Sequence, residues 1–181
     1  MTEELQRGVI PLARYQEQQL PEYQDNPLIS ALPPIPDLQE VVGLLQQLPG
    51  FGPRESLLDG RLRAHAIARL LHGFLRPLSH HLELESKISL MIRQGYIGRN
   101  PVSGAWYAHL QNGYRRVEEE DLDAAVYQSV SSTANSLSLF GCSGCGKTRT
   151  LERILGMYPQ ALHHPDYNIT QLVYLKIDCP I

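Results

Sequence analysis

The chain has 181 residues, of which 43% are hydrophobic and 19% charged, a composition typical of a folded globular protein rather than a disordered one. Its formal net charge of −3 gives no overall argument for binding nucleic acid. Neither a run of about 18 apolar residues nor a leader sequence is found, and the three cysteines suggest no disulfide framework, so a cytoplasmic protein without a membrane span is expected.

The first 36 residues are rich in proline and glutamine and carry scattered apolar side chains. Such a segment does not bury a core by itself, so residues 1–36 are expected to form an extended arm that wraps around another surface. Residues 37–130 are expected to form a mostly helical accessory region. Its first helix spans residues 37–45, with Asp37 as the N-cap, and the Pro-Gly-Phe-Gly-Pro run at 49–53 ends it.

Two longer helices are predicted next, over residues 62–75 and 81–94, from apolar side chains at helical spacing. Basic side chains accompany the first of them, at Arg61, Arg63, His65, Arg69, His72 and Arg76. This stripe has two interpretations, a surface that faces phosphate groups or an ordinary solvated face opposite apolar residues. The solvated face is favoured.

The segment around residue 112 is ambiguous. The dipeptide Asn112-Gly113 is typical of a β-hairpin, whereas Leu110, Tyr114 and Val117 have the spacing of one helix face. A helix is favoured, because the flanking residues do not alternate between apolar and polar. The acidic run 118–123 is expected to form a solvated turn that opens a further short helix.

Residues 131–181 carry the pattern of a nucleotide-binding fold. An apolar strand is predicted at 136–140, a helix at 148–157 and a second strand at 171–178, with a loop around residues 163–165. The order strand, glycine-rich loop, helix, strand predicts an α/β fold that is an incomplete P-loop domain of the AAA+ type, placed after the mostly helical region.

The loop itself matches the pattern G-x-x-x-x-G-K-[ST] in full. The predicted nucleotide-binding residues are Gly141, Cys142, Ser143, Gly144, Cys145, Gly146, Lys147 and Thr148. Glycines allow positive φ and a close approach, so that backbone amides at the helix start converge on the phosphate anion. Lys147 is expected to reach the β- and γ-phosphates of ATP, and the hydroxyl of Thr148 to coordinate Mg²⁺.

The cysteines and histidines of this region suggest two alternatives to the P-loop, a redox-active cysteine pair and a metal site. Cys142 and Cys145 form a C-x-x-C pair at a helix start, as in thioredoxin-like proteins, but no other thioredoxin feature is visible. A zinc site needs a second ligand pair, which Cys179 alone does not supply. The thiols are therefore interpreted as occupants of variable loop positions, and the pair at 163–164 as solvated histidines rather than metal ligands.

Hydrolysis would require an acidic residue on a second strand. Asp178 ends an apolar strand, as the Walker B acid does, but it follows Lys147 by only 31 residues and has no acidic neighbour. It is therefore interpreted as the end of the next strand in order, with the Walker B strand lying after Ile181. No catalytic residue is predicted.

Several longer strings carry a resemblance to a known family. In the second half of the chain they are residues 141–148, 151–155, 158–160 and 173–179, and in the first half residues 23–29, 31–34, 95–101 and 109–114. On these residues, and over essentially the whole chain, the sequence resembles the TnsC/TniB family of AAA+ ATPases, most closely the TnsC proteins of Tn-seven-like elements.

The resemblance implies an ATP-binding regulator of bacterial DNA transposition that links target selection to the transposase. It implies ATP, DNA, a target-selecting protein, the transposase and further copies of the chain as partners, and no membrane. Residue roles carry over only to the loop. Because 33 residues follow Thr148, fewer than the Walker B, sensor and arginine-finger elements of the family need, an amino-terminal fragment is expected.

Two alternatives remain open. The chain could be a non-hydrolysing fragment that docks a partner through residues 1–130, or another class of P-loop NTPase such as a nucleotide kinase. The helical front region and the lack of lid residues argue against the kinase. ATP hydrolysis is implied by the resemblance alone.

Overall fold

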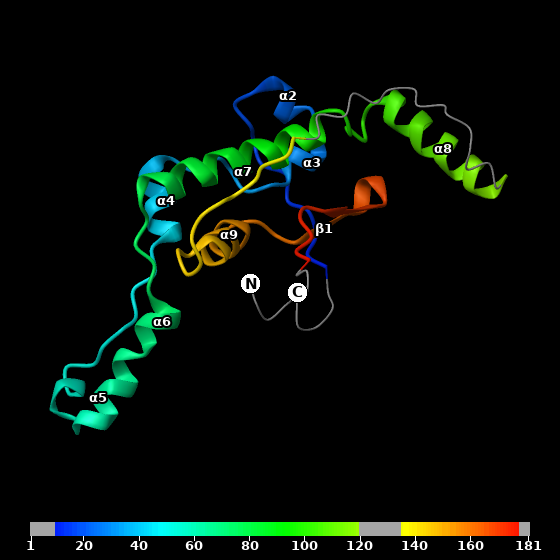
Figure 1. Ribbon diagram of the computed structural model, residues 1–181. Helices are drawn as coiled ribbons and strands as arrows, with labels where there is room; N and C mark the ends of the chain where they lie inside the picture. Colours follow the sequence, from blue (N-terminus) through cyan, green and yellow to red (C-terminus); the bar gives the residue numbers. More distant parts are fainter. Residues whose placement is uncertain (1–9, 120–134, 178–181) are drawn as a thin grey trace.

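The computed structural model describes residues 10–119 and 135–177 (Figure 1). Its α-helices are α2 (Pro21–Gln24), α3 (Pro27–Ser30), α4 (Leu38–Leu45), α5 (Gly60–Ile67), α6 (Arg69–Gly73), α7 (Ser79–Ile97), α8 (Gly104–Glu118) and α9 (Lys147–Leu155). Short 3-10 turns are η1 (Glu55–Leu57) and η2 (Pro165–Tyr167), and the strands β1 (Ala161–His164) and β2 (Ile169–Leu172) pair antiparallel. The described structure is thus mostly helical with one small antiparallel sheet, which agrees with the predicted α/β class only in that it combines helices and strands.

Helix α7 is the central element of the described structure. It contacts α2, α3, α4 and α9, and two helical segments project from its opposite ends (Figure 1). One is α8, and the other is the α5–α6 projection, which we define as residues 48–74. Among the described helices, none combines the length and the hydrophobicity that crossing a lipid bilayer requires.

Buried apolar side chains gather on two sides of α7. One cluster joins α2 and α3 to α7 and to the segment after α9, and it contains Tyr23, Leu28, Ile29, Leu32, Tyr96 and Tyr158. The other joins α4, α7 and α9, and it contains Val41, Leu45, Leu84, Ile88 and Ile154. Helix α9 is thereby anchored in the core through Ile154, near its C-terminal end.

The predicted helices are largely confirmed. Asp37 caps α4 by accepting hydrogen bonds from the amides of Gln39 and Glu40, and Glu40 bonds back to the amide of Asp37, which completes a capping box. The helix predicted at 81–94 is α7, which is longer at both ends. The helix predicted at 62–75 is instead two helices, α5 and α6, which meet at Ala68.

Helix α8 resolves the ambiguity around residue 112 in favour of the helix. It runs from Gly104 to Glu118, so Asn112-Gly113 lies inside it and forms no hairpin. Helical hydrogen bonding over fifteen residues outweighs the local turn preference of two. The acidic run begins at the end of this helix, and the rest of it lies outside the described residues.

The N-terminal arm binds the chain's own C-terminal segment. Leu12 forms a parallel bridge to His163. In this bridge the amide of Ala13 donates to the carbonyl of His163 at 2.8 Å, and the amide of His163 donates to the carbonyl of Pro11 at 2.9 Å. Farther along the arm, the amide of Gln16 donates to the carbonyl of Ser30. The arm is extended over its first described residues, but α2 and α3 within it supply buried side chains to the core. Apolar anchors at Tyr23 and Leu28 therefore fold onto α7 instead of staying in an extended segment.

The predicted strand at 136–140 is wrong. These residues have no regular secondary structure, and Phe140 is 89% exposed. The predicted strand at 171–178 is also placed wrongly, because β2 ends at Leu172, residues 173–177 are irregular and Asp178 lies outside the described residues. A buried parallel strand needs neighbours on both edges, and no described segment pairs with 136–140.

A local antiparallel hairpin takes the place of the two strands predicted at 136–140 and 171–178. The segment around His163 and His164, predicted as a loop, is β1. Residues 165–168 turn the chain, with Asn168 in the left-handed conformation at φ 50°, so that β2 returns beside β1. Closing this short connection costs far less chain entropy than pairing distant segments.

A chain of buried hydrogen bonds fixes the arm to this hairpin. The side-chain amide of Gln171 donates to the carbonyl of Leu28 at 2.9 Å, so its Oε1 is free to accept from His164 Nε2, also at 2.9 Å. His164 Nδ1 then carries no proton and accepts from the hydroxyl of Tyr15 at 3.1 Å. His164 is fully buried, and burial lowers its pKa below the ordinary value of 6.5.

This network makes the stability of the fold dependent on pH. The folded state holds His164 neutral, whereas the unfolded chain takes up a proton below about pH 6.5. The free energy of unfolding is therefore expected to fall as the pH drops through that value. His164→Gln should flatten this slope in chemical denaturation at several pH values.

The matched control is His163→Gln, one residue earlier, where the imidazole bonds to Thr170 at the surface. It should keep most of the slope of the wild type, because burial is the largest cause of the lowered pKa of His164 and the charge of His163 the smallest. Burial also lowers the pKa of His81. The free energy of unfolding therefore keeps part of its pH dependence in all three proteins. Equal slopes for the wild type and His164→Gln would show that this imidazole does not titrate as described.

Candidate functional site

The loop at 141–148 keeps the backbone geometry that its glycines allow. Gly144 and Gly146 have φ of 78° and 83°, in the left-handed region, and α9 begins directly afterwards at Lys147. A Cβ placed on either glycine would meet no atom within 4 Å, so the backbone is open on that side. The helix predicted after the loop is thus formed, while the strand predicted before it is not.

The ammonium group of Lys147 folds back over the loop. Its Nζ donates to the carbonyls of Gly141 at 2.8 Å and Cys142 at 2.7 Å, and lies 3.6 Å from the Sγ of Cys145. A single cation thereby spans the beginning and the end of the turn. These neutral acceptors are weaker partners for an ammonium group than the oxygens of an anion are.

The surroundings of the loop fit a phosphate group. The first amides of α9 have no carbonyl one turn earlier to bond to, and the positive end of the helix dipole faces the same space. The loop residues are exposed or half-buried, and so is Thr148, whose hydroxyl was predicted to bind Mg²⁺. Thr150 is turned the other way and is buried, with its hydroxyl on the carbonyl of Gly146 at 3.0 Å.

Two arginines on α9 tie this helix to the rest of the molecule. Arg149 Nη2 donates to Gln47 Oε1 at 3.0 Å and to the carbonyl of His72, and Arg153 Nη2 donates to the carbonyl of Leu44 at 2.7 Å. Sequence reasoning did not find Arg149. The residue after the Thr of the motif is variable, so its type carries no signal.

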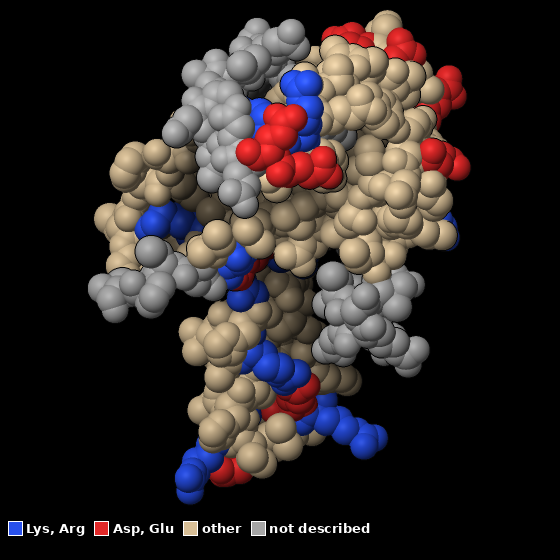
Figure 2. All heavy atoms as spheres, turned by 90° about the vertical axis from the view of Figure 1, so that its right-hand side faces the viewer, with Lys and Arg blue, Asp and Glu red and all other residues tan. Residues whose placement is uncertain are grey.

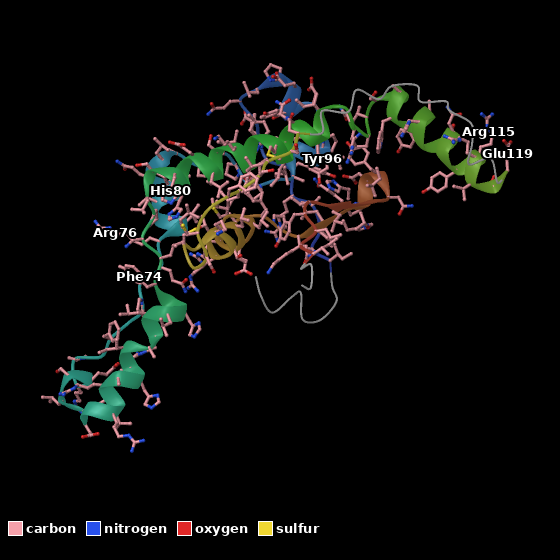
Figure 3. The ribbon with its side chains drawn as sticks, viewed as in Figure 1. Phe74, Arg76, His80, Tyr96, Arg115 and Glu119 are labelled. Atoms are coloured by element: carbon pink, nitrogen blue, oxygen red, sulfur yellow. The ribbon has the colours of Figure 1, made fainter. Side chains whose placement is uncertain are left out.

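Arg149 is hydrogen-bonded to both chain segments at the base of the α5–α6 projection, and we call the bridge between Gln47 and Leu75 at this base the neck. Gln47 and Leu75 exchange both backbone hydrogen bonds there, at 2.9 and 2.8 Å. Figure 3 places Phe74 and Arg76 at this neck, with His80 just after it at the start of α7. Arg149, the residue after Thr148, is therefore in direct contact with the neck of the projection.

The basic stripe lies on the α5–α6 projection, with Arg76 just after it, and arginine side chains are visible along the projection (Figure 2). Two of its arginines bond within the projection. Arg69 pairs with Glu55, stacks on Phe51 and donates to the carbonyl of Gly50, and Arg63 donates to the carbonyl of Ser56 at 3.2 Å. The apolar side expected to be buried is also exposed, with Leu71 at 75%.

The interpretation of the pair at 163–164 as solvated histidines is wrong for His164, which is 0% exposed. His164 is buried in the hydrogen-bond network of the hairpin, and His163 bonds to Thr170. Among residues 10–119 and 135–177 there is no group of three or more His, Cys, Asp or Glu side chains that could hold a metal ion. Asp178 and Cys179 lie outside these residues.

Comparison with protein-family models gave no match, and comparison with curated proteins gave none either. The family suggested by the sequence strings therefore stays a prediction. The features of the structure that bear on function are the loop at 141–148, helix α9 and the contacts of Lys147 and Arg149.

The left-handed glycines allow a direct test of the loop geometry. Gly146→Ala should cost about 1–2 kcal/mol in the free energy of unfolding, because an alanine pays that much for positive φ, and nothing else lies near the new Cβ. Urea denaturation of the purified variant measures it.

Gly95→Ala is the matched control. Gly95 lies inside α7 and also has open space around its Cβ. There alanine should stabilise the chain by about 0.5–1 kcal/mol, because a helical glycine loses more conformational entropy on folding. Stabilisation at both positions would contradict the left-handed conformation of Gly146.

Proposed function

We propose that the chain binds ATP with Mg²⁺ at residues 141–148 and acts as an ATP-binding regulator of DNA transposition of the TnsC/TniB type. One observation supports the binding most strongly. A loop with two left-handed glycines leads into a helix whose first residue holds an ammonium group over the loop backbone. This combination of bare amides, helix dipole and mobile cation is suited to a polyphosphate.

In the bound form, the residues of the loop take separate roles. Backbone amides between Gly144 and Thr148 bind phosphate oxygens, and Lys147 leaves its two carbonyl partners to pair with the phosphates. The hydroxyl of Thr148 contributes a ligand to Mg²⁺. Hydrolysis would need an acidic residue and a group that orients water as well, and the proposal is confined to binding.

The regulatory part of the proposal rests on the longer sequence strings of the family resemblance. It names DNA, a target-selecting protein, the transposase and further copies of this chain as partners. Its test is binding of the purified chain to duplex DNA with and without ATP and Mg²⁺, measured by fluorescence anisotropy. DNA binding that depends on nucleotide supports the regulator, and a DNA affinity that nucleotide leaves unchanged argues against it.

A partner-binding role without nucleotide is the second candidate, and the projections favour it. Every residue of α8 whose burial is described, and nearly every residue of the α5–α6 projection, is exposed or only half-buried. Tyr114 and Val117 on α8 are 71% and 70% exposed, and Figure 3 places Arg115 and Glu119 at its far end. An isolated helix of this length is marginal in water, so a bound partner would stabilise it.

Lys147→Ala separates the two candidates. Removing the cation should weaken binding of a fluorescent ATP analogue by roughly tenfold to a hundredfold, the equivalent of one charge-assisted hydrogen bond. Thr148→Ala should instead reduce the gain in affinity that Mg²⁺ gives. Fluorescence titrations with and without Mg²⁺ measure both effects.

Lys87→Ala provides the control. Lys87 is an exposed lysine on α7, so its loss changes the net charge equally without touching the loop. It should bind the analogue as the wild type does. If Lys147→Ala and Lys87→Ala bind equally well, the nucleotide site is refuted and the partner-binding candidate is left.

A further inference from the structure

The two cysteines of the loop lie on either side of a tight turn. Cys142 and Cys145 are free thiols, and both are exposed. Ser143 and Gly144 form the turn between them, and the φ of 78° at Gly144 is what the third position of a type II turn requires. The Cα atoms at the ends of such a turn lie within about 7 Å, close to the range that a disulfide spans.

The sulfur of Cys145 is turned towards the start of the loop. A Cβ built on Gly141 would lie 3.1 Å from this sulfur, so Cys145 packs against the residue that precedes Cys142. The ammonium of Lys147, 2.7 Å from the carbonyl of Cys142, lies 3.6 Å from the same sulfur. The attacking species in disulfide chemistry is a thiolate, and this cation stands where it would pair with one.

We propose that Cys142 and Cys145 are a redox modification site, and that a reversible disulfide between them prevents the loop from binding nucleotide. The effect on nucleotide rests on the proposed function, whereas formation of the disulfide does not. A structural zinc site needs four ligands, and within residues 10–119 and 135–177 no third ligating side chain joins this pair.

The reaction is thiol–disulfide exchange with a low-molecular-weight disulfide such as oxidised glutathione. The thiolate of one cysteine attacks a glutathione sulfur, which forms a mixed disulfide and releases one glutathione thiolate. The second cysteine, as its thiolate, then attacks the protein sulfur of the mixed disulfide and releases the second glutathione. The protein loses two electrons and two protons, and the glutathione disulfide is reduced to two thiols.

The disulfide changes the part of the loop that the phosphate needs. It draws the two Cβ atoms to about 3.8 Å and closes a ring over Ser143 and Gly144, so the amides of this turn can no longer adjust to an anion. It also takes the Cys145 sulfur away from Gly141 and Lys147, where it lies in the reduced loop. By linkage, bound nucleotide must oppose the disulfide by the same factor by which the disulfide opposes the nucleotide.

The experiment uses the full chain with Cys179→Ser, so that two thiols remain. The protein is equilibrated in glutathione buffers of increasing oxidising strength, and intact mass measures the loss of two hydrogens. A fluorescent ATP analogue with Mg²⁺ is titrated into the reduced and the oxidised forms. We expect the oxidised form to bind at least about tenfold more weakly, the loss of one or more charge-assisted hydrogen bonds. Saturating ATP should shift disulfide formation to more oxidising buffers.

Cys142→Ser and Cys145→Ser, each with Cys179→Ser, are the matched controls. Each keeps one thiol, so each can form a mixed disulfide with glutathione but not the internal disulfide, and intact mass distinguishes the two products. Neither variant should lose two hydrogens, and molecules that carry no glutathione should bind the analogue with the same affinity in reducing and in oxidising buffer. If no disulfide forms, or if it forms with unchanged affinity, this inference is overturned while the ATP site stands. If the reduced protein itself does not bind the analogue, the proposed function fails and the switch of nucleotide binding fails with it.

Discussion

The buried guanidinium of Arg93 holds the separate parts of this fold together. Arg93 lies on α7 and is 1% exposed, and it donates to the Ser89 hydroxyl at 2.6 Å, to the Pro33 carbonyl at 2.6 Å and to the Tyr158 hydroxyl at 3.3 Å. One charge thus joins the central helix to the end of the N-terminal arm and to the segment after α9. A buried charge is stable only when it is hydrogen-bonded, so these three segments must be in place together. Glu85 lies on the same helix, where burial raises the pKa of its carboxyl while the positive charge of Arg93 opposes that shift.

Helix α9 depends on this arrangement instead of on a sheet. In α9, Ile154 is fully buried in the cluster with α4 and α7, and Arg149 and Arg153 bond to groups around the end of α4. The loop before it therefore stands at the surface with a fixed helix behind it. This explains how the loop keeps its backbone conformation even though residues 136–140 do not form a strand.

The parts of the structure that sequence could predict are those that local interactions decide. The N-cap at Asp37 and the amphipathic spacing of α7 act within a few residues, and both are found where they were predicted. The loop glycines are also local, because their φ values follow from the lack of a Cβ. Strand pairing is not local. The apolar run 171–178 has the composition of a strand, but its partner depended on the turn at residues 165–168. That turn had a readable signal in Pro165-Asp166 and Asn168. The link from Arg149 to Gln47 and His72 joins residues far apart in sequence, and no pattern announces it.

The position of Arg149 gives the loop a mechanical connection beyond its own chemistry. Arg149 follows Thr148 on the first turn of α9, and its guanidinium contacts both chain segments that form the neck of the α5–α6 projection. Because the backbone of Arg149 follows directly from Gly146 and Lys147, a movement of the loop backbone there would carry the guanidinium with it. The neck is a single bridge between Gln47 and Leu75 with no further strand pairing, so its resistance to such a movement is small compared with that of the core behind α9. A change in the loop would therefore displace the projection more easily than α7, and the projection carries exposed apolar side chains, among them Phe51, Leu57 and Leu71.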